Sequence, residues 1–157
     1  MSLQATQVSG ATLALNSGAL AIGSTTSQYS VATAVNYLHK GVFGQRTTDA
    51  SEAFLIVPGT GLVPTAPNSF VNLAAGELCH FAIVVRASDN ALYTIQGPIV
   101  PNDQLVAPLP AVPDGFILIG SVKVSAAAAF TVGTTALNAA NITTTYFNLG
   151  SHPGRAL

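Results

Sequence analysis

Side chains that could do acid–base or metal chemistry are few in this chain of 157 residues, which has six acidic residues, five basic residues and three histidines. Asp49 and Glu52 are close in sequence, but a catalytic acid–base pair is normally built from separate strands or loops. A solvated capping pair on one helical turn over Thr48–Phe54 is the favoured interpretation. The histidines are His39, His80 and His152. No two of them have the spacing of zinc ligands, so we expect no catalytic residue, no metal and no cofactor.

Other residues of reactive type have a structural interpretation. Cys79 is the single cysteine and lies in an apolar run, so we expect a small buried hydrophobe rather than a reactive thiol. The glycine-rich stretch Pro58–Gly61 lacks the Lys-Ser/Thr ending of a phosphate-binding loop and predicts a turn. The four tyrosines could stack on sugars, but their places in predicted strands favour core or interface packing. The chain is therefore not expected to be an enzyme.

Charged side chains make up only 7% of the chain, whereas a soluble globular protein usually carries about 25%. The net charge is −1 and the basic residues are scattered, so the chain lacks the electrostatic signature of a nucleic-acid binder. Polar residues interrupt the neutral N-terminal stretch, so we expect neither a membrane span nor a secretory signal. Few charges protect a small domain poorly against self-association. This composition predicts a surface that meets other protein.

We expect β-strands rather than helices to make up most of the fold, because apolar residues recur at every second position wherever the sequence shows a regular pattern. Tyr29–Leu38 alternates, and His39–Gly41 predicts a hairpin turn before a second strand over Val42–Arg46. Leu78–Arg86 is almost continuously apolar, which predicts a central strand covered on both faces. A turn at 88–90 and a returning strand over 91–96 follow it.

Gly115–Val124 predicts a further strong strand, in which Phe116, Leu118, Val122 and Val124 share one face and Ile117 and Ile119 the other. Thr143–Leu149 predicts the last strand, and Ala53–Val57 and Ser69–Leu73 are weaker edge strands. The predicted fold class is mainly β with little helix. It is a single β-sandwich, or a jelly-roll-like or barrel domain, over residues 28–150.

Residues 1–27 are expected to form an N-terminal arm or edge strand that is ordered mostly by a neighbour. Residues 97–114 are rich in proline, which removes backbone donors, so they predict an extended crossover that wraps the sandwich or docks across a subunit boundary. Residues 151–157 form a C-terminal tail. The candidate assembly interface comprises Leu13, Leu15, Leu20, Ile22, Ile99, Val100, Leu105, Val106 and Leu109.

Stretches of the chain resemble small virion proteins of tailed bacteriophages, the hypothetical or head-decoration proteins. These stretches are AVNYLHKGVFGQRTTDA from Ala34, GELCHFAIVVRASDNALYTIQG from Gly76, LPAVPDGFILIGSVKV from Leu109 and AFTVGTTALNAANITTTYFNL from Ala129. The order of hairpin, apolar strand, proline-bearing crossover and threonine-rich segment is also similar to that family. The resemblance carries no matched functional residues.

The resemblance implies a non-enzymatic decoration or cement protein of the capsid. Such a protein is made in the host cytoplasm and binds the outer head shell, through the major capsid protein or another virion protein. A symmetric homo-oligomer, with a trimer favoured, is expected. The alternative is a fibre or tail-associated module that recognises a host receptor or glycan through loops around Pro58–Asn68 and Ser88–Asn90.

Overall fold

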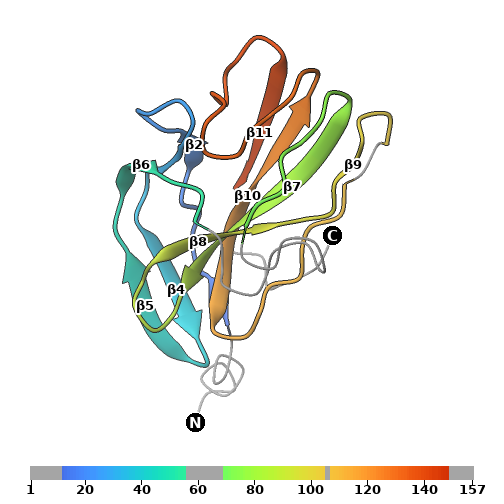
Figure 1. Cartoon of the computed structure of the whole chain (residues 1–157). Helices are drawn as coiled ribbons and strands as arrows, with labels where there is room; N and C mark the ends of the chain where they lie inside the picture. The colour runs from blue at the N-terminus through green and yellow to red at the C-terminus, as the bar shows by residue number, and fades with distance from the viewer. Residues whose placement is uncertain (1–11, 56–68, 105–106, 149–157) are drawn as a thin grey trace.

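The computed structural model describes residues 12–55, 69–104 and 107–148. These residues form eleven β-strands and no helix, in three antiparallel sheets that pack in a sandwich-like arrangement (Figure 1). The predicted mainly β fold is therefore confirmed. Within the same residues, no helix is long and apolar enough to cross a membrane.

The largest sheet has five strands. In chain order they are β7 (Glu77–Arg86), β8 (Leu92–Gln96), β9 (Val100–Pro101), β10 (Phe116–Ala126) and β11 (Ile142–Asn148). The order across the sheet is β11-β10-β7-β8, and β9 also pairs with β7. β7 lies in the centre with apolar side chains buried on both faces, as its sequence predicts.

A bulge in β10 makes the predicted facing of its side chains wrong. The register against β7 shifts between Leu118 and Gly120, so one extra residue is inserted and the alternation changes phase. Phe116 and Leu118 pack on one face of the sheet. The opposite face, toward the main core, receives Ile117, Ile119, Val122 and Val124.

A second sheet contains β1 (Leu13–Ala14), β4 (Val35–His39) and β5 (Val42–Arg46), in the order β1-β4-β5. The predicted hairpin joins β4 to β5. Its two-residue turn has positive φ angles at Lys40 (49°) and Gly41 (82°), which fits the tight turns that match the twist of paired strands.

The third sheet corrects two predictions. It contains β2 (Leu20–Ile22), β3 (Tyr29–Val31) and β6 (Asp49–Glu52), in the order β2-β3-β6. The strand predicted over 29–38 is thus split, because the backbone N–H of Thr33 donates to Gly18 and the chain passes to another sheet. The helical turn predicted over 48–54 is wrong: its residues 49–52 are the strand β6, whose carboxylates bind Arg46.

The weaker predicted strands are not regular strands. Residues 53–55 are irregular, and the rest of that prediction lies outside the described residues. Residues 69–73 contribute only an isolated bridge between Leu73 and Phe130.

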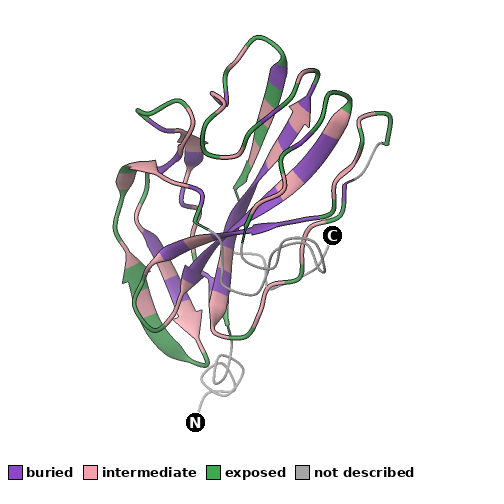
Figure 2. Cartoon of the chain, viewed as in Figure 1, coloured by how far each residue is buried: buried purple, intermediate pink, exposed green. Residues whose placement is uncertain are grey.

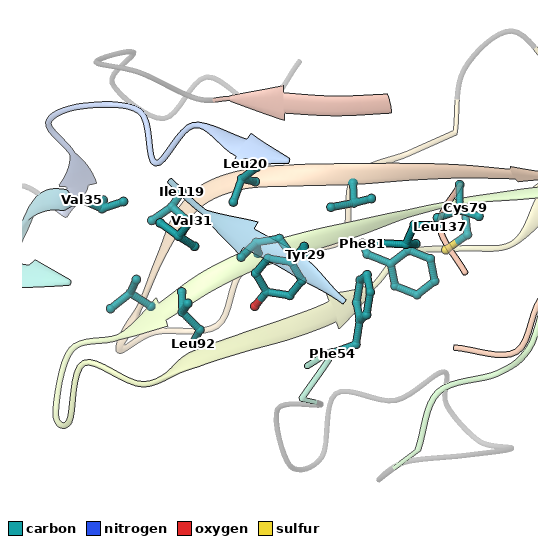
Figure 3. Packing of buried hydrophobic residues seen from close by; sticks show 14 of the residues in the cluster. Leu20, Tyr29, Val31, Val35, Phe54, Cys79, Phe81, Leu92, Ile119 and Leu137 are labelled. Atoms are coloured by element: carbon teal, nitrogen blue, oxygen red, sulfur yellow. The ribbon is translucent and has the colours of Figure 1, made fainter. Parts of the chain in front are cut away.

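The main core lies where the three sheets meet (Figure 2). Phe81 of β7 is fully buried, and its ring centroid lies 5.5 Å from that of Phe54 and 6.1 Å from that of Phe70. Both pairs have the edge-on geometry that aromatic rings favour. Leu20 lies among the side chains of this core (Figure 3).

Candidate assembly surface

The β4–β5 hairpin presents large apolar side chains to solvent. Val42 is 69% exposed and Phe43 is 61% exposed, and both belong to β5, an edge strand of its sheet. Figure 2 shows most of β5 in the colour of exposed residues. The exposure follows from position, because β5 has a partner strand on one side only.

The register places apolar residues of the three neighbouring strands in one row. Leu13 of β1 is opposite Leu38 of β4, and Leu38 is opposite Phe43 of β5. Leu15 extends the set, because its N–H donates to the carbonyl of Asn36 at 2.8 Å and alternation puts its side chain on the same face as Leu13. We call Leu13, Leu15, Leu38 and Phe43 the outer apolar face. Leu15 is 38% exposed, and Leu13 and Leu38 are half-buried.

The opposite face of the same sheet is fixed on the core. Val35 and Tyr37 of β4 are buried there. The ring of Tyr37 lies over Gly44 of β5, where a Cβ would come within 2.4 Å of it. This close approach holds β5 against β4 and leaves the outer apolar face turned away from the core.

Charge is almost absent from this sheet. Arg46 is the one charged residue within β1, β4 and β5, and its guanidinium binds Asp49 at 3.0 Å and also Glu52. Burial, followed by the neighbouring Asp49 carboxylate, raises the pKa of Glu52 above its usual value. The scarcity of charge in the sequence therefore becomes an uncharged surface at this sheet.

Ionic side chains gather instead around the loops at the hairpin end of the molecule. Lys40 binds Asp114 at 3.0 Å, and Arg86 binds Asp89 and holds its pKa at about 2. The Arg86 guanidinium also lies 4.6 Å from the centre of the Tyr93 ring. A shallow hollow of about 380 Å³ between these loops is lined by His39, Arg86, Ala87, Ser88, Asp114, Gly115 and Phe116.

The residues predicted as an assembly interface do not form one surface. Leu20 is only 4% exposed and belongs to the core, and Ile22 and Ile99 pack against the core. Val100 and Leu109 are half-buried, while Leu105 and Val106 lie outside the described residues. Leu13 and Leu15 are brought together on the outer apolar face.

Leu38 and Phe43 complete that face and were missed from the sequence. The sequence did hold a signal for Phe43: it follows a tight turn and lies in a short strand that also contains polar residues. Such a strand is typical of the edge of a sheet. The sequence did not show which face of the hairpin would be covered.

The proline-rich crossover contacts its own chain. Asn102 donates its N–H to the carbonyl of Gly76 at 2.8 Å, and Ala107 is buried. Val112 packs against Ala82, Val84 and Ile95, on the face of the large sheet opposite the main core. The described part of the N-terminal segment is likewise paired within the chain, through β1 with β4 and through β2 with β3.

The groups of reactive type have structural surroundings. Cys79 is buried, its thiol contacts the carbonyl of Gly97 at 3.2 Å, and burial raises its pKa to about 12. His80 is half-buried beside Phe147, with ring centroids 5.5 Å apart. Burial and then the charge of Lys123 lower the His80 pKa. The described residues contain no group of three His, Cys, Asp or Glu side chains that could hold a metal ion.

Comparisons with known proteins add no relative: no family model, no curated protein and no solved structure matches this chain.

Proposed function

We propose that this chain is a non-enzymatic structural protein of a bacteriophage virion, which decorates the outer head shell and stabilises it. The outer apolar face is the observation that carries the proposal. It joins apolar side chains of three strands in one uncharged patch, and the largest of them, Phe43, is 61% exposed. Contiguous apolar surface of this kind marks a protein-binding site. The resemblance of the sequence to head-decoration proteins supplies the identity of the partner, the major capsid protein or another virion protein.

Binding at this face has a modest strength for each copy. Burial of apolar surface contributes about 25 cal/mol per Å², and the two leucines of the face at positions 13 and 38 are already half-buried. Many copies bound to one shell, or joined as a homo-oligomer, would add their contributions through multivalency. A decoration protein therefore needs no single tight site.

The test uses heads that lack the protein and measures binding of the purified chain by co-sedimentation. Leu15→Glu places a charge on the outer apolar face, and we expect it to abolish binding. Leu55→Glu is the matched control, because Leu55 is 49% exposed and lies outside that face. Equal binding by both variants, or no binding by the unaltered chain, would contradict the proposal.

A second candidate function is recognition of a host glycan by a fibre or tail module. It is favoured by the hollow at the hairpin end, where Arg86 and Asp114 offer polar groups beside the ring of Phe116. Ser88 of the predicted recognition loop lines this hollow, whereas the other predicted loop, residues 58–68, lies outside the described residues. Glycan-array binding that is lost in Arg86→Ala, without shell binding, would favour this function over decoration.

A further inference from the structure

The open edge of β5 has the features of a strand that pairs with another strand. Edge strands are normally protected by lysines, prolines, bulges or a covering segment. β5 contains no proline or lysine, and its pairing with β4 runs without a shift from Val42 to Arg46. No hydrogen bond from another described segment reaches the backbone at its outer side.

Two edges of the large sheet are contacted in part by other described segments. At β8, the N–H of Thr94 donates to the carbonyl of Leu55, and the side chain of Gln96 binds the backbone of Val71. At β11, the side chain of Asn148 accepts the N–H of Leu20. At β5, no described segment makes such a contact with the outer backbone, so this edge is available to a partner.

The hairpin register shows which backbone groups face outward. In a two-residue hairpin the pair that flanks the turn, here His39 and Val42, is hydrogen bonded, and bonded pairs alternate along the strands. The N–H and C=O groups of Phe43 and Gln45 therefore point away from β4. The same alternation on β4 is seen directly, because the carbonyl of Asn36 accepts from Leu15 of β1.

We propose that β5 pairs antiparallel with β5 of a second copy, about a two-fold axis at Gly44. In this register the backbone N–H and C=O of Phe43 in each copy form hydrogen bonds with the C=O and N–H of Gln45 in the other copy. Every outward backbone group of both residues is then satisfied. The two glycines at position 44 form the close, non-bonded pair at the axis, with no side chains to separate them. The row Leu13–Leu38–Phe43 then ends opposite Gln45 of the second copy, and the two Phe43 rings become diagonal neighbours.

The charges are compatible with this pairing. The two Arg46 side chains lie at opposite ends of the paired strands, each opposite Val42 of the other copy. The turn that carries Lys40 approaches the partner's end where one arginine meets two carboxylates, and Lys40 is itself paired with Asp114, so no like charges are forced together. No two like charges are placed directly opposite each other.

The inference does not depend on the virion role, because it concerns the isolated chain. Sedimentation of the pure protein should give a concentration-dependent mass of twice 15.9 kDa. An antiparallel edge pair is two-fold, whereas the sequence resemblance favours a trimer, so the measured mass separates the two.

Variants at Gln45 test the backbone contact. Gln45→Pro removes the outward N–H, which an edge strand tolerates, and should weaken the dimer at least about tenfold, a loss of about 1.4 kcal/mol. Gln45→Ala is the matched control: it loses the side-chain bond to Asn36 but keeps the N–H, so the dimer should persist. Circular dichroism checks that both variants fold.

Phe43→Lys gives a second variant, which opposes like charges across the axis and should also give monomer. Amide hydrogen exchange of residues 43 and 45 in the unaltered chain gives a measurement without substitution, and exchange should slow on concentration. A monomer at all concentrations, a trimer, or equal dimerisation by Gln45→Pro and Gln45→Ala would overturn the inference. Loss of shell binding with the dimer intact would overturn only the proposed function.

Discussion

A substitution at Leu20 tests whether the N-terminal segment packs on its own chain or is ordered by a neighbouring molecule. The sequence predicts that residues 1–27 are ordered mostly by a neighbour and places both Leu15 and Leu20 at an interface. In the structure Leu20 is 4% exposed within the core of its own chain, whereas Leu15 is 38% exposed. The same substitution to alanine at the two positions should therefore have very different effects on the isolated protein.

The magnitude follows from the surroundings of Leu20. Its Cδ1 atom lies against the backbone of Gly120, only 2.5 Å from where a Cβ would be. Gly120 belongs to β10, which is paired with β7 on one side and β11 on the other, so this wall cannot move in to fill a cavity. Leucine-to-alanine changes in a core cost about 2–5 kcal/mol, and a rigid site favours a value of about 3–4 kcal/mol. Leu15→Ala should change stability by no more than about 0.5 kcal/mol.

Thermal unfolding of the two variants, followed by circular dichroism at low concentration, measures the difference. For a chain of this length each kcal/mol shifts the Tm by about 2–4 °C, so Leu20→Ala should lower the Tm by roughly 6–16 °C. Leu15→Ala should lower it by no more than about 2 °C. Similar small shifts for both variants would refute the reasoning, because they would mean that the segment does not pack on its own chain.

Three further predictions concern titratable groups. Cys79 should be inert to a thiol reagent in the folded protein and react fully in denaturant, because burial raises its pKa to about 12; rapid reaction of the folded chain would contradict this. The pKa of His80 is lowered from its usual 6.5 by burial and by Lys123, so the free energy of unfolding should fall as pH drops below about 6.5. Denaturant titrations should show this loss reduced in His80→Gln, and an unchanged pH profile would count against it. The pKa of Glu52 is raised from its usual 4.5, so stability should decline as pH rises through its folded pKa; Glu52→Gln should flatten that slope, and a steeper one would contradict the assignment.

Elements with a strong local signal could be predicted from the sequence. The β4–β5 hairpin follows from a polar residue and glycine at Lys40–Gly41, which adopt the positive φ angles that a two-residue turn needs. The central strand β7 follows from its continuous apolar run, since a strand buried on both faces shows no alternation. Burial of Cys79 follows from its place in that run.

Features that depend on distant partners could not be predicted. Residues 49–52 have the pattern of a capped helical turn, but the guanidinium of Arg46 and the pairing of β6 with β3 hold them as a strand. The alternation of β10 gives no sign of the bulge after Leu118, because only the register against β7 reveals the extra residue. The outer apolar face was found only in part for the same reason: Leu38 and Phe43 join Leu13 through strand pairing.

The sequence by itself determined that this protein is mainly β and that its surface carries little charge, because strand period and composition are properties of neighbouring residues and of the residue count. Only the tertiary structure decided where the uncharged surface gathers. It buried Leu20, exposed Phe43 and left the edge of β5 without a partner among the described residues. The fate of an apolar side chain depends on which strand lies across from it and on which face the rest of the chain covers.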